Sequence, residues 1–350
     1  MATIILTGGG TAGQCTPNLA LIPYLKNDFN KIYYIGSENG IERKIIENEG
    51  IPYYSVSCAK LNRGNLLNNF TLPYKVIKGI NQAGKIIDKL KPDVVFSKGG
   101  YVSIPTVIAC AKRKIPVISH ESDYSVGLAN KISAKFSKKI LTSFPETALN
   151  IKNAQYVGSP IRQTIHTASK NESLKYFGFN GQKPILLVTG GSQGAKALND
   201  AIRASFSEIL PKFDILHVCG KDNLIKENTP QGYYQTEYLN NMENAYAVAN
   251  VCVSRAGANT VFELMSLQIP SVLIPLPKGA SRGDQILNAK YFQKLGLAHV
   301  LSQDILTPQS LSFTINSVYA NRLNLARNFK NHPIKDASRE ISRIIIDCLH

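Results

Sequence analysis

Short apolar runs that end in glycine occur in both halves of the 350-residue chain. Residues 3–13 read TIILTGGGTAG, and residues 185–196 read ILLVTGGSQGAK. Each apolar run is short and β-branched enough to form a buried parallel strand, and the glycines after it lead into a helix. The chain therefore contains one pattern of strand, glycine loop and helix twice.

A second pair of matching segments follows in the same order. Residues 96–122 and 253–277 both read as a strand, a turn of serine, a basic residue and glycine, a helix, an Ile-Pro pair and another strand. Repeated patterns of this kind predict repeated structural units. We therefore expect an α/β fold of two similar doubly wound, Rossmann-like domains, each a parallel sheet with helices on both faces.

Glycine and proline interrupt the pattern in YVGSPIR, residues 156–162. This interruption places the expected domains at 1–157 and 158–335. Residues 336–350 read as a helix with several isoleucines on one side, which could cap the second domain or pack back on the first. Ligands bind at the carboxyl ends of strands in such sheets, so two facing domains would enclose a cleft.

Composition indicates a folded protein with neither a membrane span nor a metal or disulfide framework. Apolar residues make up 44% of the chain and charged residues 18%. The longest apolar stretch, near residues 107–111, is far shorter than the ~18 residues of a spanning helix. The start, MATIILTGGG, lacks the basic region and cleavage site of a signal peptide. The six cysteines are scattered without a C-x-x-C pair, so we expect no disulfide and no zinc site.

The net charge is +16, and the excess of basic residues is larger in the first half. Residues 1–158 contain 20 Lys and Arg against 10 Asp and Glu, and the remainder contains 20 against 14. A basic surface suits nucleic acid, anionic lipid or phosphorylated substrates. No nucleic-acid motif is present, so a phosphate-bearing substrate at an anionic membrane surface fits better. The alternative is a proteome that is basic throughout.

The first glycine loop matches the dinucleotide-binding fingerprint at Gly8, Gly10 and Gly13. A dehydrogenase also needs an acidic residue at the end of the next strand to hold the ribose. Here the strand KIYYIGS ends in Gly36 and Ser37 instead. A nicotinamide-dependent oxidoreductase is therefore the less favoured alternative.

Three segments of the second half carry polar groups that suit a nucleotide-sugar. Residues 190–194, GGSQG, lack the Walker A spacing but offer several N–H groups to a diphosphate. Glu263, one turn into the next helix, could accept both hydroxyls of a ribose or could be an ordinary helix-start carboxylate. Residues 281–285, SRGDQ, could bind sugar hydroxyls or water. No Asp-x-Asp is present, so the leaving-group charge would be met by helix N-termini and basic side chains, not by a bridging metal.

The motifs together resemble the MurG family of glycosyltransferases of bacterial cell-wall synthesis. Seven of them occur in order over nearly the whole chain, and the Asp123 and Gly283-Asp284-Gln285 versions resemble its Gram-positive branch. They are the glycine loop at 7–17, SKGGYVS at 97–103, HESD at 120–123 with GLANK after it, GSPIR at 158–162, GGSQGAK at 190–196, SRAGANTVFE at 254–263 and SRGDQILNA at 281–289.

The resemblance implies a GT-B fold of two Rossmann-like domains and an enzyme without a cofactor. The implied reaction is an inverting, metal-independent transfer of GlcNAc from UDP-GlcNAc. The implied acceptor is the MurNAc 4-hydroxyl of lipid I, undecaprenyl-diphosphate-MurNAc-pentapeptide, and the product is lipid II. The implied location is peripheral, on the cytoplasmic face of the bacterial cell membrane, with no nucleic-acid partner.

The resemblance also assigns residues to the two substrates. Arg162 and Leu239 would flank the uracil, Glu263 would hold the ribose, and Asp284 with Gln285 would bind the GlcNAc hydroxyls. The donor-binding set is Thr11, Ala12, Gly13, Asp123, Arg162, Gly191, Ser192, Gln193, Leu239, Arg255, Ala258, Glu263, Asp284 and Gln285. The acceptor-binding set is Gly10, Gln14, Gly99, Gly100 and Tyr101, and the catalytic candidates are His120, Glu121, Asp123 and Gln14.

Gln14 departs from the family, whose first loop ends in histidine. A carboxamide cannot take a proton near neutral pH, whereas an imidazole can. If that histidine is the general base, the chain is either a binding-competent but impaired paralogue or uses Asp123 or Glu121 instead. If it only hydrogen-bonds a phosphate, glutamine can replace it at modest cost.

An apolar and basic segment between residues 60 and 91 predicts a peripheral membrane contact. The expected contact residues are Leu66, Leu67, Phe70, Lys75 and Lys78. In the alternative interpretation, half of the apolar residues in this segment belong to the domain core.

Overall fold

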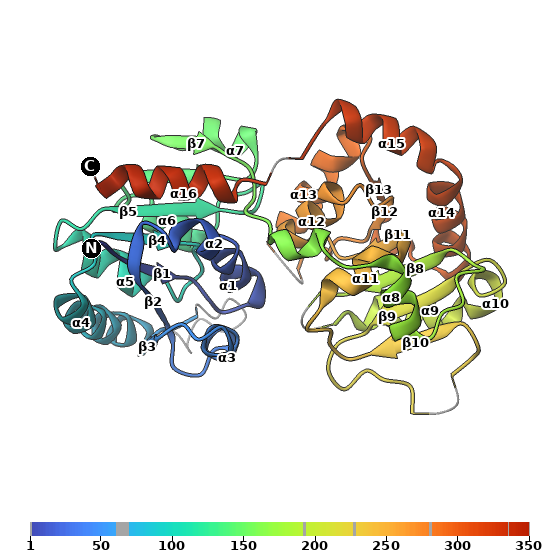
Figure 1. Cartoon of the computed structure of the whole chain (residues 1–350), viewed down its shortest axis with the longest axis horizontal. Helices are drawn as coiled ribbons and strands as arrows, with labels where there is room; N and C mark the ends of the chain where they lie inside the picture. Colours follow the sequence, from blue (N-terminus) through green and yellow to red (C-terminus); the bar gives the residue numbers. More distant parts are fainter. Residues whose placement is uncertain are drawn as a thin grey trace. The chain divides into compact units, whose positions relative to one another are not determined.

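The computed structural model describes residues 2–60, 70–191, 194–226, 229–279, 282–334 and 336–349. The chain forms two compact units (Figure 1). The first unit contains residues 1–162 together with 336–350, and the second contains residues 163–335. No helix among the described residues is both long and apolar enough to span a bilayer.

The first unit is built on a seven-stranded parallel sheet with the order β3-β2-β1-β4-β5-β6-β7. The order reverses between β1 and β4, which is the point where ligands bind in doubly wound sheets. The strands are β1 (Ala2–Thr7), β2 (Phe29–Ser37), β3 (Tyr53–Val56), β4 (Val94–Ser97), β5 (Val117–Glu121), β6 (Lys139–Thr142) and β7 (Ala154–Tyr156). The helices are α1 (Ala12–Leu19), α2 (Ile22–Leu25), α3 (Ile41–Asn48), α4 (Leu72–Leu90), α5 (Ile104–Ala111), α6 (Leu128–Ser133), α7 (Pro145–Leu149), α16 (Ser338–Ile346) and η4 (Asp347–Leu349).

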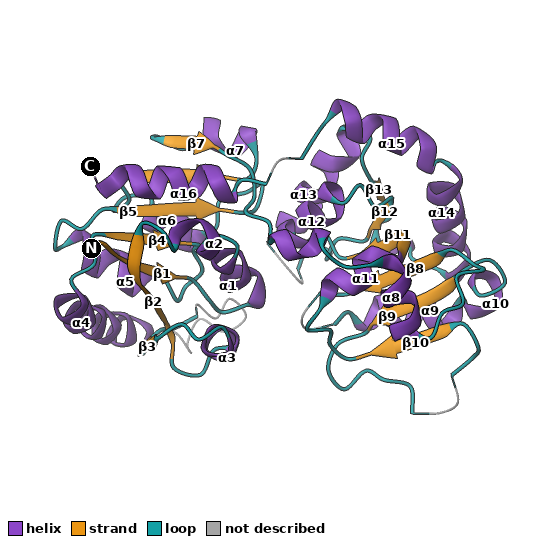
Figure 2. Cartoon of the chain, in the orientation of Figure 1, coloured by secondary structure: helices purple, strands orange, loops and turns teal. Residues whose placement is uncertain are grey.

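Helices cover both faces of this sheet (Figure 2). Ile4 and Leu6 of β1 pack in one buried cluster with residues of α1, α2, α3 and α16, whereas Ile5 packs in the other cluster with residues of α4 and α5. Successive residues of a strand point to opposite faces, so a strand covered on both sides must be apolar throughout. Ile341 and Ile345 of α16 lie in the first cluster, so the C-terminal helix packs on the first sheet.

The second unit repeats the architecture with a six-stranded parallel sheet of order β10-β9-β8-β11-β12-β13. Its order reverses between β8 and β11, in the same way as between β1 and β4. The strands are β8 (Ile185–Thr189), β9 (Asp214–Val218), β10 (Tyr233–Thr236), β11 (Ala249–Ser254), β12 (Ser271–Leu273) and β13 (His299–Val300). The helices are η2 (Gln163–His166), α8 (Lys170–Phe177), α9 (Lys196–Ala204), α10 (Phe206–Ile209), α11 (Met242–Val248), α12 (Ala258–Ser266), α13 (Asp284–Lys294), η3 (Gln303–Ile305), α14 (Pro308–Ala320) and α15 (Arg322–Asn331). The prediction of two doubly wound parallel sheets is confirmed.

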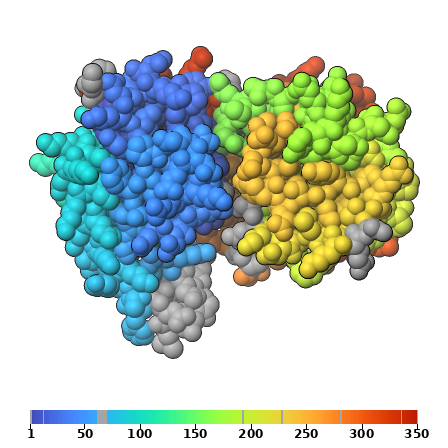
Figure 3. Space-filling view, turned by 60° about the horizontal axis from the view of Figure 1, so that its bottom comes forward, coloured from blue at the N-terminus to red at the C-terminus, as the bar shows by residue number. Residues whose placement is uncertain are grey.

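Helix α4 divides the apolar residues of its segment between the core and the surface. Gly79, Ala83 and Ile87 face the protein, with Ala83 and Ile87 in the core of the first unit. Near the start of the helix, by contrast, Phe70 is 81% exposed, Tyr74 69% and Ile77 58%. Figure 3 shows this end of α4 in light blue on the surface of the first unit. Lys75 and Lys78 are exposed as well, while the predicted contact residues Leu66 and Leu67 lie outside the described residues.

Candidate functional site

Two glycine-containing loops of the first unit pack directly against each other. The first glycine loop, residues 8–13, follows β1, and residues 97–101 follow β4. Gly10 has φ of 91°, and a Cβ there would lie 2.5 Å from the Tyr101 ring. Gly100 has φ of 80°, and a Cβ there would lie 2.4 Å from the carbonyl oxygen of Gly9. Any larger residue would separate the loops, so the structure brings together Gly10, Gly100 and Tyr101 of the predicted acceptor set.

Glu42, which the sequence did not single out, holds the first glycine loop. Its fully buried carboxylate accepts hydrogen bonds from the backbone N–H of Gly10 at 3.2 Å and from the N–H of Ser37 at 3.2 Å. The Ser37 hydroxyl donates a further bond at 2.5 Å. A carboxylate bound in this way fixes the first glycine loop to the end of β2. The only signal in the sequence was a carboxylate in a first helical turn, which is usually exposed.

Gln14 offers an unused acceptor beside these loops. Its backbone N–H bonds the carbonyl of Thr11 at 3.0 Å, as expected in the first turn of α1. Its side-chain oxygen Oε1 is buried, and no hydrogen bond reaches it from the described residues. Buried amide oxygens are normally satisfied, so this atom is suited to accept a hydrogen bond from a ligand group.

His120, at the end of β5, is fully buried and engaged at both ring nitrogens. Nε2 lies 3.0 Å from the carbonyl oxygen of Gly158, and Nδ1 lies 2.6 Å from Lys98 Nζ. A carbonyl only accepts, so Nε2 carries the proton and Nδ1 accepts from the lysine. Burial, and then the positive charge of Lys98, lower the pKa of His120 well below its usual value. The imidazole is therefore neutral, and both of its nitrogens are hydrogen-bonded within the protein.

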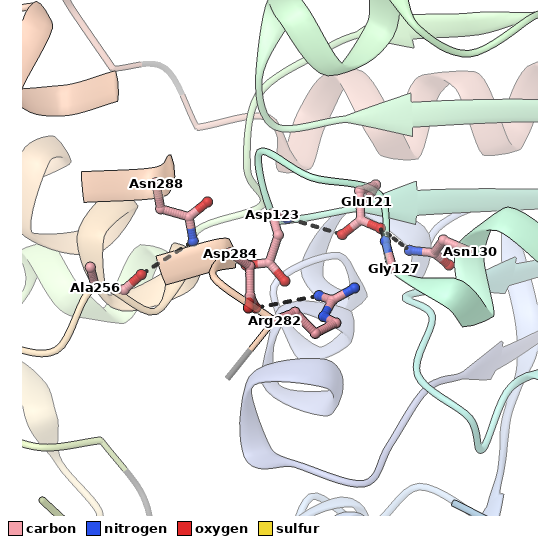
Figure 4. Close-up of polar contacts among 8 residues, drawn as sticks. All are labelled: Glu121, Asp123, Gly127, Asn130, Ala256, Arg282, Asp284 and Asn288. Atoms are coloured by element: carbon pink, nitrogen blue, oxygen red, sulfur yellow. Dashed lines mark hydrogen bonds and ion pairs between the residues drawn. The ribbon is translucent and has the colours of Figure 1, made fainter. Parts of the chain in front are cut away.

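Glu121 is also hydrogen-bonded within the protein, and its carboxylate holds the turn that follows β5 (Figure 4). One carboxylate oxygen accepts from the backbone N–H of Asp123 at 3.0 Å. The other accepts from the N–H of Gly127 at 2.9 Å and from Nδ2 of Asn130 at 2.9 Å. The side chain is almost completely buried. Glu121 thus positions Asp123, which is only half-buried.

In the second unit, the described residues Gly190, Gly191 and Gly194 of the corresponding glycine loop follow β8. Gly194 donates its N–H to the carbonyl of Gly191 at 3.0 Å, and the N–H of Gly191 lies 3.3 Å from Thr189 Oγ1. A Cβ at Gly191 would meet nothing within 4 Å, so this side of the loop is open. The predicted diphosphate-binding residues Ser192 and Gln193 lie outside the described residues.

Glu263 and Arg255 have different surroundings although both were predicted to bind the donor. The carboxylate oxygen Oε2 of Glu263 accepts a hydrogen bond from the hydroxyl of Tyr246 at 2.8 Å, a partner that no sequence motif indicated. Arg255 donates to the carbonyl oxygens of Ile274 at 3.1 Å and Pro275 at 3.4 Å. It also donates to the side-chain oxygen of Gln303 at 2.6 Å. Burial lowers the pKa of Arg255, and its contacts join loops of the second sheet.

The start of α13 brings two predicted sugar-binding residues to the same edge as the turn after β11. Asp284 forms an ion pair with Arg282 at 3.3 Å (Figure 4). Gln285 Oε1 accepts from the backbone N–H of Leu276 at 3.0 Å, and Asn288 Nδ2 donates to the carbonyl of Ala256 at 3.2 Å. These bonds fix the segment relative to its own sheet.

The remaining predicted residues differ in burial. Gly99 is buried and Gly13 partly buried, whereas Thr11 is exposed. Ala258 and Leu239 are buried in the second unit. Arg162 lies in the first unit, where its Nε is buried and makes no hydrogen bond to a described residue. Ala12 begins α1.

Comparison with known proteins relates both units to one family. Residues 4–142 match the glycosyltransferase family 28 N-terminal domain, and residues 185–342 match the glycosyltransferase family 28 C-terminal domain. The chain is 47% identical over 349 residues to a protein of Clostridium botulinum, with 99% of both chains covered. That relative is named UDP-N-acetylglucosamine–N-acetylmuramyl-(pentapeptide) pyrophosphoryl-undecaprenol N-acetylglucosamine transferase. A relative with the same name from Geobacillus kaustophilus is 48% identical over 349 residues, with 98% of both chains covered.

Solved structures share the fold over the whole chain. The crystal structure of MurG from Acinetobacter baumannii gives a TM-score of 0.74 at 22% identity and covers 99% of both chains. The glycosyltransferase of kitacinnamycin gives a TM-score of 0.75 at 14% identity, covering 100% of this chain and 99% of that one. The predicted GT-B fold is confirmed by these likenesses.

Proposed function

The chain belongs to glycosyltransferase family 28, and on that basis we propose that it transfers GlcNAc from UDP-GlcNAc to lipid I, giving lipid II for peptidoglycan synthesis. The resemblance to MurG glycosyltransferases is confirmed by relatives that share almost half of its residues over its full length. The chain is an enzyme of the hexosyltransferase class. The proposal rests mainly on the 47% identity, over 349 residues, to a relative named as a transferase acting on a muramyl-(pentapeptide) pyrophosphoryl-undecaprenol.

We propose that the second unit binds UDP-GlcNAc. The Glu263 carboxylate, oriented by Tyr246, accepts hydrogen bonds from the ribose hydroxyls. The loop of residues 190–194, including Gly191, Ser192 and Gln193, donates N–H groups to the diphosphate. Asp284 and Gln285 bind the GlcNAc hydroxyls, with Arg255 and Ala258 supporting this edge. Leu239 flanks the uracil, and Arg162, which belongs to the first unit, is the second residue proposed to do so.

The first unit is proposed to bind the acceptor and the face of the donor sugar. Gly10, Gly99, Gly100 and Tyr101 form the paired loops against which the muramyl group lies. Residues 11–13 approach the GlcNAc ring through the start of α1. Gln14 Oε1, which accepts no hydrogen bond from the described residues, accepts one from an acceptor hydroxyl.

Asp123 is the proposed general base. In an inverting transfer the 4-hydroxyl oxygen of MurNAc attacks C1 of GlcNAc, the bond from C1 to the diphosphate oxygen breaks, and the hydroxyl proton passes to the base. Glu121 is engaged by three N–H donors, and both ring nitrogens of His120 are bonded inside the protein. These two residues position the turn, whereas Asp123 is nearer to solvent. The charge of departing UDP is met by backbone N–H groups and positive side chains, without a metal.

Turnover of the natural chain tests the proposal directly. UDP release from UDP-GlcNAc with a lipid I analogue is measured for the natural chain and for Gln14→His. We expect turnover by both, at rates within about tenfold of each other, because a hydrogen bond supplied by glutamine replaces one supplied by histidine. Turnover by the variant alone would favour the impaired paralogue. Stabilisation against heating by NADH but not by UDP would favour an oxidoreductase.

We also propose that the chain works at the cytoplasmic face of the membrane through the exposed start of α4. Phe70, Tyr74 and Ile77 are apolar and exposed, and Lys75 and Lys78 lie beside them in sequence. Such a combination binds anionic bilayers peripherally. It would bring the first unit to a lipid-linked acceptor, and no role in nucleic-acid binding is proposed for the basic surface.

A further inference from the structure

Lys98 is a buried cation that the proposed reaction leaves without a role. Its side chain has no exposed surface, and its backbone N–H donates to the carbonyl of Thr7 at 2.9 Å. Its Nζ lies 2.6 Å from His120 Nδ1 and also donates to the hydroxyl of Ser122. Burial of an ammonium costs several kcal/mol of free energy unless charges and hydrogen bonds compensate it, so its retention under the catalytic turn requires an explanation.

We propose that Lys98 is a positioning residue for the transfer reaction, one whose ammonium fixes the turn after β5 and provides the internal positive charge that keeps Asp123 ionised. The inference rests on the proposed function, because it takes Asp123 as the base. Lys98 itself cannot touch a substrate, since it is fully buried.

The contacts of Lys98 span the turn that carries Asp123. Through His120 the lysine is linked to the carbonyl of Gly158, and through Ser122 it is linked to the residue directly before Asp123. Glu121 holds the same turn from its other side through the N–H groups of Asp123 and Gly127. The residue before Asp123 is therefore bonded to Lys98 through its hydroxyl, and the backbone N–H groups of Asp123 and Gly127 are bonded to Glu121.

Charge supports the same role. The charged groups that act on Lys98 are the carboxylates of Glu121 and Asp123, and His120 faces it as a neutral ring. Burial lowers the pKa of Lys98 to about 7, and both carboxylates oppose that change. Lys98 is thus protonated in the acidic range where Asp123 would take up a proton. A nearby positive charge lowers the pKa of a carboxyl group, so Lys98 extends the activity of Asp123 to lower pH.

Lys98→Met tests the inference because it keeps most of the length of the unbranched side chain and removes its charge, and Lys98→Arg keeps a charge. Lys44→Met, at an exposed position on α3, is the matched control. For Lys98→Met we expect kcat near pH 7 to fall about tenfold, because the turn that carries Asp123 loses the bond between Ser122 and the lysine. The acid limb of the kcat profile should move up by about one pH unit, because a nearby positive charge lowers the pKa of a carboxyl group by about one to three units. The KM for UDP-GlcNAc should change less than twofold.

Histidine nitrogen NMR supplies a readout that does not depend on turnover, with His120→Gln identifying the signal. In the natural chain we expect His120 to stay neutral with its proton on Nε2 from pH 5 to 9. In Lys98→Met it should begin to take up a proton at higher pH than in the natural chain, because burial still lowers its pKa but the additional effect of the Lys98 charge is gone. Lys98→Arg should restore part of the lost kcat.

The pH profile and the His120 signals of folded Lys98→Met decide whether Lys98 is a positioning residue. A natural pH profile and natural His120 signals in folded Lys98→Met would overturn the inference. If circular dichroism shows that Lys98→Met does not fold, Ser122→Ala is measured instead. A shift in the acid limb of its kcat profile, or a lower kcat, supports the positioning role of Lys98. An unchanged profile with unchanged kcat contradicts that role. If the natural chain itself does not release UDP, the proposed function fails instead, and the NMR signals still show whether Lys98 fixes His120.

Discussion

The two units place a buried cation at the same point of the same architecture but surround it differently. Lys98 directly follows β4 and Arg255 directly follows β11, the strands next to β1 and β8, which are the first strands of their units. Their backbone N–H groups donate to the carbonyl of the threonine that ends β1 or β8, at 2.9 Å to Thr7 and 3.3 Å to Thr189. The common fold therefore fixes the backbone at these positions, and the neighbours decide what the charge does.

In the second unit the hydrogen-bond partners of the cation among the described residues are neutral. Arg255 donates to two carbonyl groups and one amide oxygen, and these hydrogen bonds join loops of the sheet. In the first unit Lys98 contacts an imidazole and lies near two carboxylates. On the proposed function, we therefore expect proton transfer to depend on the first unit and donor binding to depend on the second.

A second matched pair shows how far the shared framework extends. Asn18 and Asn199 both lie five residues after the last glycine of their loop. Asn18 Nδ2 donates to the Tyr34 hydroxyl at 3.1 Å, and Asn199 Oδ1 lies 3.0 Å from His217 Nε2. Each asparagine thus ties the helix after the glycine loop to the second strand of its sheet, with a different partner.

The largest expected effect comes from removing the proposed base of the first unit. Asp123→Asn should lower kcat by about 10²- to 10⁴-fold, because general base catalysis contributes that much. The KM for UDP-GlcNAc should change little. Steady-state UDP release measures both, and Asp28→Asn, an exposed carboxylate of the same unit, is the control. Full activity of Asp123→Asn would remove the assignment of proton transfer to this turn.

The second largest effect is expected on donor binding by the second unit. Glu263→Gln should raise the KM for UDP-GlcNAc about 10- to 100-fold with a smaller change in kcat, because hydrogen bonds to a charged group contribute about 1.5–3 kcal/mol. Tyr246→Phe should act in the same direction and less strongly, since it removes only the orienting hydroxyl. Glu172→Gln on α8 is the control. Titration calorimetry with UDP checks binding separately, and unchanged affinity would contradict the role of Glu263.

A third prediction contrasts the exposed apolar residues of the two units. Replacing Phe70, Tyr74 and Ile77 together by serine should weaken binding to anionic liposomes by more than about tenfold, because burying one large apolar side chain contributes about 1.5–3 kcal/mol. Turnover of a short-chain soluble acceptor should stay unchanged. Tyr176 and Phe313 are 64% and 76% exposed in the second unit, and replacing them by serine is the control. Equal liposome binding by all three proteins would contradict the membrane proposal.

The smallest kinetic effect is expected for the cation of the second unit. Arg255→Met should lower the free energy of unfolding by about 1–3 kcal/mol, because it removes hydrogen bonds from buried carbonyl oxygens. The pH dependence of kcat should remain that of the natural chain, in contrast to Lys98→Met. Thermal denaturation and the pH profile measure the two effects. A raised KM for UDP-GlcNAc in a stable Arg255→Met protein would show instead that the guanidinium contacts the donor.

The sequence by itself determined the architecture and the family. Apolar runs such as residues 3–7 and 185–189 predicted buried parallel strands, and their repetition predicted two similar sheets. The isoleucines of α16 predicted a one-sided helix, but both domains remained possible partners for it. These features are local, because periodicity, β-branching and glycine act within a few residues of the chain.

Only the tertiary structure decided which polar groups meet. Glu42 binds the N–H of Gly10 from 32 residues away, and His120 reaches the carbonyl of Gly158 across 38 residues. Tyr246 meets Glu263 because α11 and α12 are brought together beside one sheet. Such contacts depend on strand order and on the way helices pack over the sheet. Local sequence patterns specify neither of these. The sequence does not show whether a carboxylate in a first helical turn, or a histidine at a strand end, is exposed or buried. Burial decides the role of such a residue, because a buried and fully bonded side chain can position its neighbours but cannot reach a substrate proton.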